Sequence, residues 1–206
     1  MTLEGVQDIR AVVWALDGVL NRAKPGAWVP RVARELGIDA AAMERAVFRH
    51  DPAALLEGRE DVLDRLQDWL DAQGADADAE DVLELWLPAD HDPDPELSRL
   101  VQALAEAGVV QALWVQADSR RARWIAQESG WAEQVDAVLT SSAIGAVMPA
   151  ALAPIEALLA LPPHQILLID SHPARVEAAE KRGWLGWDYT PGGARPLALA
   201  LMPLLV

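Results

Sequence analysis

The hydrophobic residues of this chain follow two patterns. Some form short, continuous apolar runs, which are typical of strands buried on both faces, and others recur every three or four positions, which predicts amphipathic helices. From about residue 92 the two patterns alternate, and this alternation predicts a parallel sheet with right-handed helical crossovers. The predicted strands cover residues 9–16, 109–115, 135–139, 166–169 and 184–187, and the helices that follow or separate them cover 97–104, 119–129, 150–160, 173–182 and 196–206.

The segment between residues 20 and 91 shows helical spacing and no convincing strand. Its predicted helices cover residues 28–36, 40–49, 60–73 and 78–87, and Pro88 is expected to stop the last of them. The predicted fold class is therefore α/β. A three-layer, Rossmann-like parallel-sheet core is expected from residues 1–19 and 92–206, with an inserted all-helical cap from residues 20–91.

The first apolar run ends at Asp17-Gly18, and two interpretations of this ending are open. Asp-Gly between apolar residues is typical of a type I′ hairpin turn. A hairpin needs a returning strand, however, and only Val19 and Leu20 follow before the polar Asn21. The pattern favours a central parallel strand that ends in a functional loop, because the carboxyl ends of such strands carry the functional residues of open α/β sheets.

Composition narrows the function classes further. The 206 residues carry a net charge of −15, which argues against nucleic acid or an anionic membrane as the main partner. The chain has no cysteine, so thiol catalysis, disulfides and cysteine-based zinc sites are excluded. The first ten residues lack the pattern of a signal peptide, and the apolar residues 196–206 are too few to span a bilayer. A cytoplasmic protein is expected.

Polar or small residues follow the predicted strands at 15–17, 116–119, 140–142 and 170–172, and a further element lies at 145–149. In order and spacing, this chain resembles the haloacid dehalogenase-like (HAD) superfamily, in its branch of phosphatases with a small helical cap. The resemblance covers essentially the whole chain. It rests on the stretches Ala15-Leu16-Asp17-Gly18-Val19-Leu20, Val115-Gln116-Ala117-Asp118, Gly145-Ala146-Val147-Met148-Pro149 and Ile169-Asp170-Ser171.

The resemblance also shows where the chain departs from the family. Ala15 stands at the position of the nucleophilic aspartate, Gln116 at that of the phosphoryl-binding Ser/Thr, Met148 at that of the lysine, and Ser171 at that of the second acidic residue. Three of these changes remove a charge that a phosphate–Mg²⁺ site needs, which predicts a less charged, more apolar pocket.

Two acidic residues of the family pattern remain. Asp17 stands at the general acid/base position and Asp170 at a Mg²⁺-ligand position, although either carboxylate could instead cap its loop. The candidate binding residues are Gln116, Ala117 and Lys24. Lys24 follows the opening loop and is considered as a substitute for the missing lysine; the alternative is a solvated residue.

The leading hypothesis is a HAD-like protein that has lost phosphatase or dehalogenase activity and is retained to bind a small ligand or a protein partner. No cofactor is expected for it, and Mg²⁺ is expected only under the alternative that follows. The alternative is a weak Mg²⁺-dependent phosphatase or hydrolase acting on a small phosphorylated metabolite, supported by Asp17 and Asp170. A homodimer formed through the tryptophan-rich cap is a third interpretation, since the chain has nine tryptophans.

Overall fold

The computed structural model describes residues 5–205. A five-stranded sheet with the order β3-β2-β1-β4-β5 forms the centre of the core, and all four neighbouring pairs are parallel. Parallel pairing of the first strand with both neighbours rules out the hairpin interpretation of its ending. The strands are β1 (Ala11–Ala15), β2 (Val110–Val115), β3 (Ala137–Thr140), β4 (Ile166–Asp170) and β5 (Leu185–Asp188).

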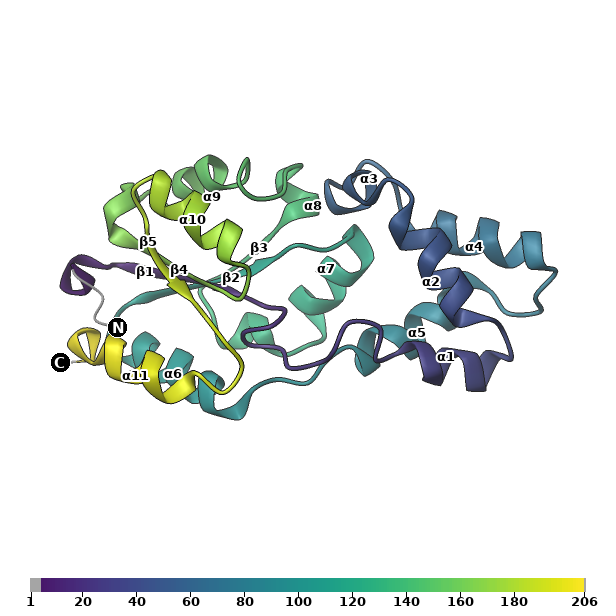
Figure 1. Cartoon of the computed structure of the whole chain (residues 1–206), viewed down its shortest axis with the longest axis horizontal. Helices are drawn as coiled ribbons and strands as arrows, with labels where there is room; N and C mark the ends of the chain where they lie inside the picture. Colours follow the sequence, from purple (N-terminus) through teal and green to yellow (C-terminus); the bar gives the residue numbers. More distant parts are fainter. Residues whose placement is uncertain (1–4, 206) are drawn as a thin grey trace.

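Helices cover both faces of this sheet, which gives the three layers predicted (Figure 1). Successive residues of β1 point to opposite faces, so Val12 and Trp14 pack in one hydrophobic cluster and Val13 in the other. One face carries α6 (Pro95–Glu106) and α11 (Ala194–Leu201), and the other carries α9 (Leu152–Leu159) and α10 (Pro173–Lys181). Two further helices, α7 (Ser119–Gln127) and α8 (Ser141–Ile144), follow β2 and β3, and short 3-10 turns lie at Val6–Asp8, Trp131–Glu133, Pro163–Gln165 and Met202–Leu204.

The helices between β1 and α6 pack around a hydrophobic cluster of their own. Aspartate side chains cap several of them: Asp39, Asp61 and Asp78 each accept a hydrogen bond from a backbone N–H of the first turn. The five helices are α1 (Val29–Leu36), α2 (Ala40–Arg49), α3 (Pro52–Leu56), α4 (Val62–Gln73) and α5 (Ala79–Ala89). We refer to them together as the cap.

Two expectations for the cap were wrong in detail. Pro88 does not stop α5 but lies inside it, and the helix continues to Ala89. Because Pro88 is in the last turn, it removes one hydrogen bond without interrupting a longer helix. The short helix α3 was not predicted, although Asp51 caps it and Pro52 begins it. Five residues are too few to show a helical period.

The end of the chain packs on the core. Leu197 and Leu201 of α11 and Leu204 of the following turn are buried against the sheet. The helix itself ends earlier than expected, at Leu201, and Val206 lies outside the described residues. Within residues 5–205, no helix is long and apolar enough to cross a bilayer.

Asn21 connects the two linkers that join cap and core. Its side-chain amide donates to the Asp90 carbonyl at 2.9 Å, and its Oδ1 accepts from the Asp92 N–H at 2.8 Å. The backbone continues this pairing, since Arg22 donates to the Asp92 carbonyl at 2.8 Å. The entry and exit of the cap therefore lie side by side, beyond the carboxyl end of β1 (Figure 1).

Candidate functional site

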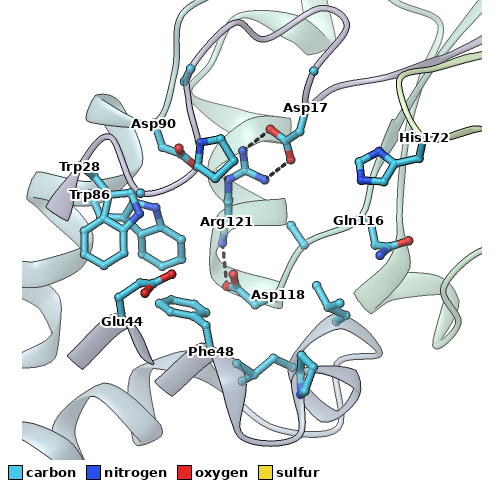
Figure 2. A pocket seen from close by; sticks show the side chains of 18 of the residues that line it. Asp17, Trp28, Glu44, Phe48, Trp86, Asp90, Gln116, Asp118, Arg121 and His172 are labelled. Atoms are coloured by element: carbon cyan, nitrogen blue, oxygen red, sulfur yellow. Dashed lines mark hydrogen bonds and ion pairs between the residues drawn. The ribbon is translucent and has the colours of Figure 1, made fainter. Parts of the chain in front are cut away.

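A cavity of about 540 Å³ lies between the cap and the carboxyl ends of the strands (Figure 2). Its volume falls within the roughly 300–1,000 Å³ typical of small-molecule sites. Residues after three strands form the core wall, and cap residues form the opposite wall. The lining residues used below are Asp17, Gly18, Gln116, Ala117, Asp118, Arg121, Ser171 and His172 from the core, and Trp28, Glu44, Phe48, Trp86 and Asp90 from the cap and its exit.

The cap wall is mainly aromatic. Trp28, Phe48 and Trp86 pack against one another, with ring centroids 5.1–6.2 Å apart. Glu44 lies on α2 one helical turn before Phe48, so both side chains reach the same side of the cap (Figure 2). Trp28 lies just before α1, Glu44 and Phe48 lie on α2, and Trp86 lies on α5. Sequence analysis did not identify any of these four as site residues.

Arg121 of α7 dominates the polar side of the cavity. Its Nη1 and Nη2 atoms donate to the two carboxylate oxygens of Asp17, at 2.8 and 2.6 Å. Its Nε atom lies 3.0 Å from Oδ2 of Asp90. The Arg121 side chain is 11% exposed, so this guanidinium is an almost buried cation held between two carboxylates.

This arrangement sets the protonation state of Asp17. Burial alone would raise the pKa of Asp17, but the hydrogen bonds and charge of Arg121 outweigh burial and hold the pKa below its ordinary value. In the same way the two carboxylates raise the pKa of Arg121, although burial opposes its charge. A carboxylate with a lowered pKa is a weaker base, and one bound to arginine on both oxygens is not free to exchange protons with a substrate.

The pKa values of two other carboxylates in the cavity wall, Asp90 and Asp118, shift in the opposite direction. Burial raises the pKa of Asp90, an effect that Arg121 only partly offsets. Burial also raises the pKa of Asp118, whose Oδ1 accepts the backbone N–H groups of Arg120 and Arg121 at 3.0 Å each. Asp118 thus caps α7 and fixes the helix that carries Arg121.

Asp170 does not face the cavity. Its side chain is fully buried and accepts the backbone N–H of His172 at 2.8 Å. Arg175 lies 3.4 Å from its second oxygen, so this carboxylate holds the loop to the start of α10.

The candidate Mg²⁺ ligand, Asp170, does not fit a magnesium site. Its oxygens are held by the His172 N–H and by Arg175, and Arg121 occupies both oxygens of Asp17, the other acidic residue that remains of the family pattern. In the part of the chain that the structure describes, no group of three or more His, Asp or Glu side chains is placed to hold a metal ion. Mg²⁺ needs several oxygen ligands in near-octahedral order, and these residues do not supply them.

Of the remaining candidate residues, some line the cavity and others do not. Gln116 lines it, and its buried Oε1 has no hydrogen-bond partner within residues 5–205. The backbone N–H of Ala117, another lining residue, donates to the Ser141 hydroxyl at 3.1 Å. Ser171 also lines the cavity.

Three candidates lie elsewhere. Ala15 is buried at the end of β1, and Met148 is buried in the cluster that packs beneath α9. Neither residue is part of the cavity wall. Lys24 is exposed and lies outside the wall as well, so the structure does not place an amine where the family has its lysine.

The expectation of a less charged, more apolar pocket is met in its apolar cap wall but was wrong about charge. The cavity is lined by four carboxylate side chains, those of Asp17, Glu44, Asp90 and Asp118, and by the Arg121 guanidinium. The positive charge in the cavity wall comes from Arg121 of α7, outside the family positions considered. Sequence analysis missed Arg121 because it belongs to none of the motif stretches.

Two further contacts hold the cap against the core. Arg120 donates from Nε to both oxygens of Asp61 at 2.9 Å, which joins α7 to the start of α4. The pKa of Asp61 is lowered by these hydrogen bonds. On the other side, Gly58 packs so closely on α8 that a Cβ atom there would lie 2.6 Å from the Ser142 carbonyl oxygen.

Replacing Gly58 with alanine is expected to loosen the cap. Its φ of +69° is left-handed, and the new Cβ would collide with backbone. Gly74 has a similar φ of +64° but open space around it. Gly74→Ala should therefore lower the free energy of unfolding by about 1 kcal/mol, and Gly58→Ala by about 2–3 kcal/mol. Urea unfolding measures both, and hydrogen exchange in α3 and α8 should increase only for Gly58→Ala. Equal effects would show that the contact is unimportant.

Comparison with known proteins supports the fold. No family sequence model and no curated protein sequence matches this chain. Solved structures do match. A predicted HAD-like family hydrolase from Porphyromonas gingivalis superposes with a TM-score of 0.73 at 20% identity, over 94% of this chain and 98% of that one.

Two further matches carry ligands. An aspartate-to-alanine mutant of a HAD family enzyme from Bacteroides thetaiotaomicron, in complex with magnesium and inorganic phosphate, has a TM-score of 0.72 at 15% identity, over 89% and 94% of the two chains. L-2-haloacid dehalogenase from Xanthobacter autotrophicus, with chloropropionic acid covalently bound, has a TM-score of 0.62 at 19% identity, over 86% of this chain and 76% of that one. At these identities the likeness shows the fold: this chain has the fold of HAD-like hydrolases.

Proposed function

We propose that this protein is a non-hydrolytic member of the HAD-like fold that binds a small ligand in the cavity between cap and core. The observation that carries the proposal is the double hydrogen bond between Arg121 and Asp17, next to a strand that ends in Ala15. The residue at the acid/base position is bound on both oxygens, and the residue at the nucleophile position has a methyl group.

Each requirement of the family mechanism that we expected from the resemblance is unmet. A methyl group cannot attack phosphorus or carbon. Losing the nucleophile of a catalytic unit costs on the order of a million-fold in rate. The acid/base residue Asp17 is held by Arg121, and the Mg²⁺-ligand position, Asp170, is held by its own loop and by Arg175. We therefore do not propose the magnesium and phosphate of the Bacteroides mutant as ligands of this chain.

Retained binding is supported by the cavity. It is concave, of small-molecule size, and has an aromatic wall facing polar groups that converge from three strand ends. Among the polar groups, the buried Oε1 of Gln116 is an acceptor whose hydrogen-bonding capacity is unused within residues 5–205. A buried acceptor without a partner costs stability, so the stability of the fold does not explain its presence.

A panel of phosphate esters and haloacids with Mg²⁺ tests the loss of hydrolysis. The purified protein should show turnover at the background rate, and Asp17→Asn should leave that rate unchanged. Turnover well above background that Asp17→Asn abolishes would refute the proposal and support the weak Mg²⁺-dependent hydrolase instead. Asp39→Asn, a change at an exposed cap of α2, serves as the matched control.

A further inference from the structure

The charges of the cavity do not favour an anion. Of the residues that line it, Arg121 carries the one permanent positive charge, and each of its three side-chain nitrogens faces a carboxylate oxygen. The four carboxylates exceed this single cation. A phosphate ester or carboxylic acid entering the cavity would meet a net negative charge and an arginine already engaged.

Glu44 is the carboxylate that remains for a ligand. Asp17 and Asp90 pair with Arg121, and Asp118 caps α7. Glu44 makes no ion pair within residues 5–205, and it is half-buried in the cap wall. In Figure 2 its carboxylate is directed into the cavity, next to Phe48 and the two indoles.

The aromatic side chains near Glu44 determine which part of a ligand can lie beside it. The faces of aromatic rings carry partial negative charge and attract cations, tryptophan most strongly. The rings of Trp28, Phe48 and Trp86 contact one another, so a cation cannot lie between them. The cluster instead presents an apolar surface to the cavity, with the free carboxylate at its edge.

From these contacts we infer that the cavity binds a small organic cation, an amine carried on an apolar or aromatic body. This inference rests on the proposed binding function. The ammonium group lies beside Glu44, and the apolar body packs on Phe48 and on the exposed edges of Trp28 and Trp86, whose rings are otherwise buried. The net charge of −15 of the whole chain assists the approach of such a ligand.

Three probes of nearly equal size and different charge test the inference: phenethylammonium, phenethyl alcohol and phenylacetate. Calorimetry and ligand-observed NMR at neutral pH measure their affinities for the full chain. The cation should bind about tenfold more tightly than the alcohol, and phenylacetate should bind most weakly. Added salt should reduce the difference, because an interaction between charges that is partly open to water is screened.

Glu44→Gln identifies the residue responsible. It should weaken phenethylammonium about five- to thirtyfold, the range expected for a partly desolvated charge contact, and change the alcohol less than about twofold. Glu84→Gln is the matched control, since Glu84 is exposed on α5, outside the cavity wall, and its replacement removes the same charge from the cap. It should leave all three affinities unchanged.

Several outcomes would overturn the inference. These are phenylacetate binding as tightly as the cation, equal effects of Glu44→Gln and Glu84→Gln, or no binding by any of the three probes. If phenethyl alcohol binds as tightly as phenethylammonium, the preference for a cation is refuted, whereas the proposed binding function is still supported. Failure of the proposed function itself has a different signature, namely hydrolytic turnover that depends on Asp17.

Discussion

Arg121→Met is expected to lower the free energy of unfolding by about 3–5 kcal/mol. The substitution keeps most of the side-chain length but removes the cation between Asp17 and Asp90. Removing one partner of a buried ion pair leaves the other charge uncompensated, and typical losses are of this size. Asp90, which is 15% exposed, accounts for most of the expected loss, because Asp17 is 48% exposed and water can solvate it.

Urea unfolding followed by tryptophan fluorescence measures this change. Arg123→Met is the matched control, because Arg123 is exposed on the same helix and should change stability by less than about 0.5 kcal/mol. Adding Asp90→Asn to Arg121→Met should recover part of the loss, since it removes the orphaned charge. The ion-pair explanation fails if Arg121→Met costs no more than Arg123→Met, or if Asp90→Asn makes the variant worse.

Trp14→Ala is expected to lower the free energy of unfolding by about 4–8 kcal/mol. Trp14 is fully buried in the central strand, and loss of a large aromatic side chain from a core typically costs about 3–5 kcal/mol. In addition, its indole N–H donates to Oε1 of Gln111 at 2.7 Å. Gln111 is fully buried as well, so the substitution leaves this oxygen without its donor, at a further cost of about 1–3 kcal/mol.

A second variant separates the two contributions. Trp14→Phe keeps much of the ring and loses the N–H, so it should cost about 1–3 kcal/mol from the unpaired Gln111 oxygen. Adding Gln111→Met to Trp14→Phe should restore part of that stability in a double-mutant cycle. No coupling between the two positions in urea unfolding would show that the hydrogen bond contributes little.

The fold was predictable because its strands are buried on both faces. Every residue of β1 and β4 is buried, and apart from Asp170 at the end of β4 all of them are apolar, so these strands stand out from the helices. The ends of elements were less predictable. Pro88 and α3 show why: the final turn of a helix tolerates proline, and a helix of five residues has no period to detect.

The candidate site was predictable only in part. The strand-end rule places Asp17, Gln116 and Ser171 at one edge of the sheet, and they do line the same cavity. Arg121 could not be chosen from the sequence with the same ease, because Arg120 and Arg123 lie on the same helix. The information that could have identified Arg121 is its position. It lies in the first turn of α7, directly after Asp118, at the edge of the sheet where the strands end.

The residues of the cap wall could not be predicted from the sequence, because only the tertiary structure brings them together. Trp28 and Trp86 are far apart in the sequence, and helical spacing assigns both to buried faces without saying which face meets the cavity. The pair Glu44 and Phe48, spaced by four residues on α2, was the available signal. A glutamate one turn from an aromatic residue is too common on helices to identify a site.

The pairing of the two linkers at Asn21 makes the cap an insertion whose two ends lie next to each other. Leu20 and Asp94 are joined by a backbone hydrogen bond of 2.8 Å, and the next pair along, Arg22 and Asp92, by another. A span of this kind is short enough for a tight turn to close. The cap could therefore be exchanged for another insertion without shifting β1 or α6, so ligand choice can change while the core stays constant.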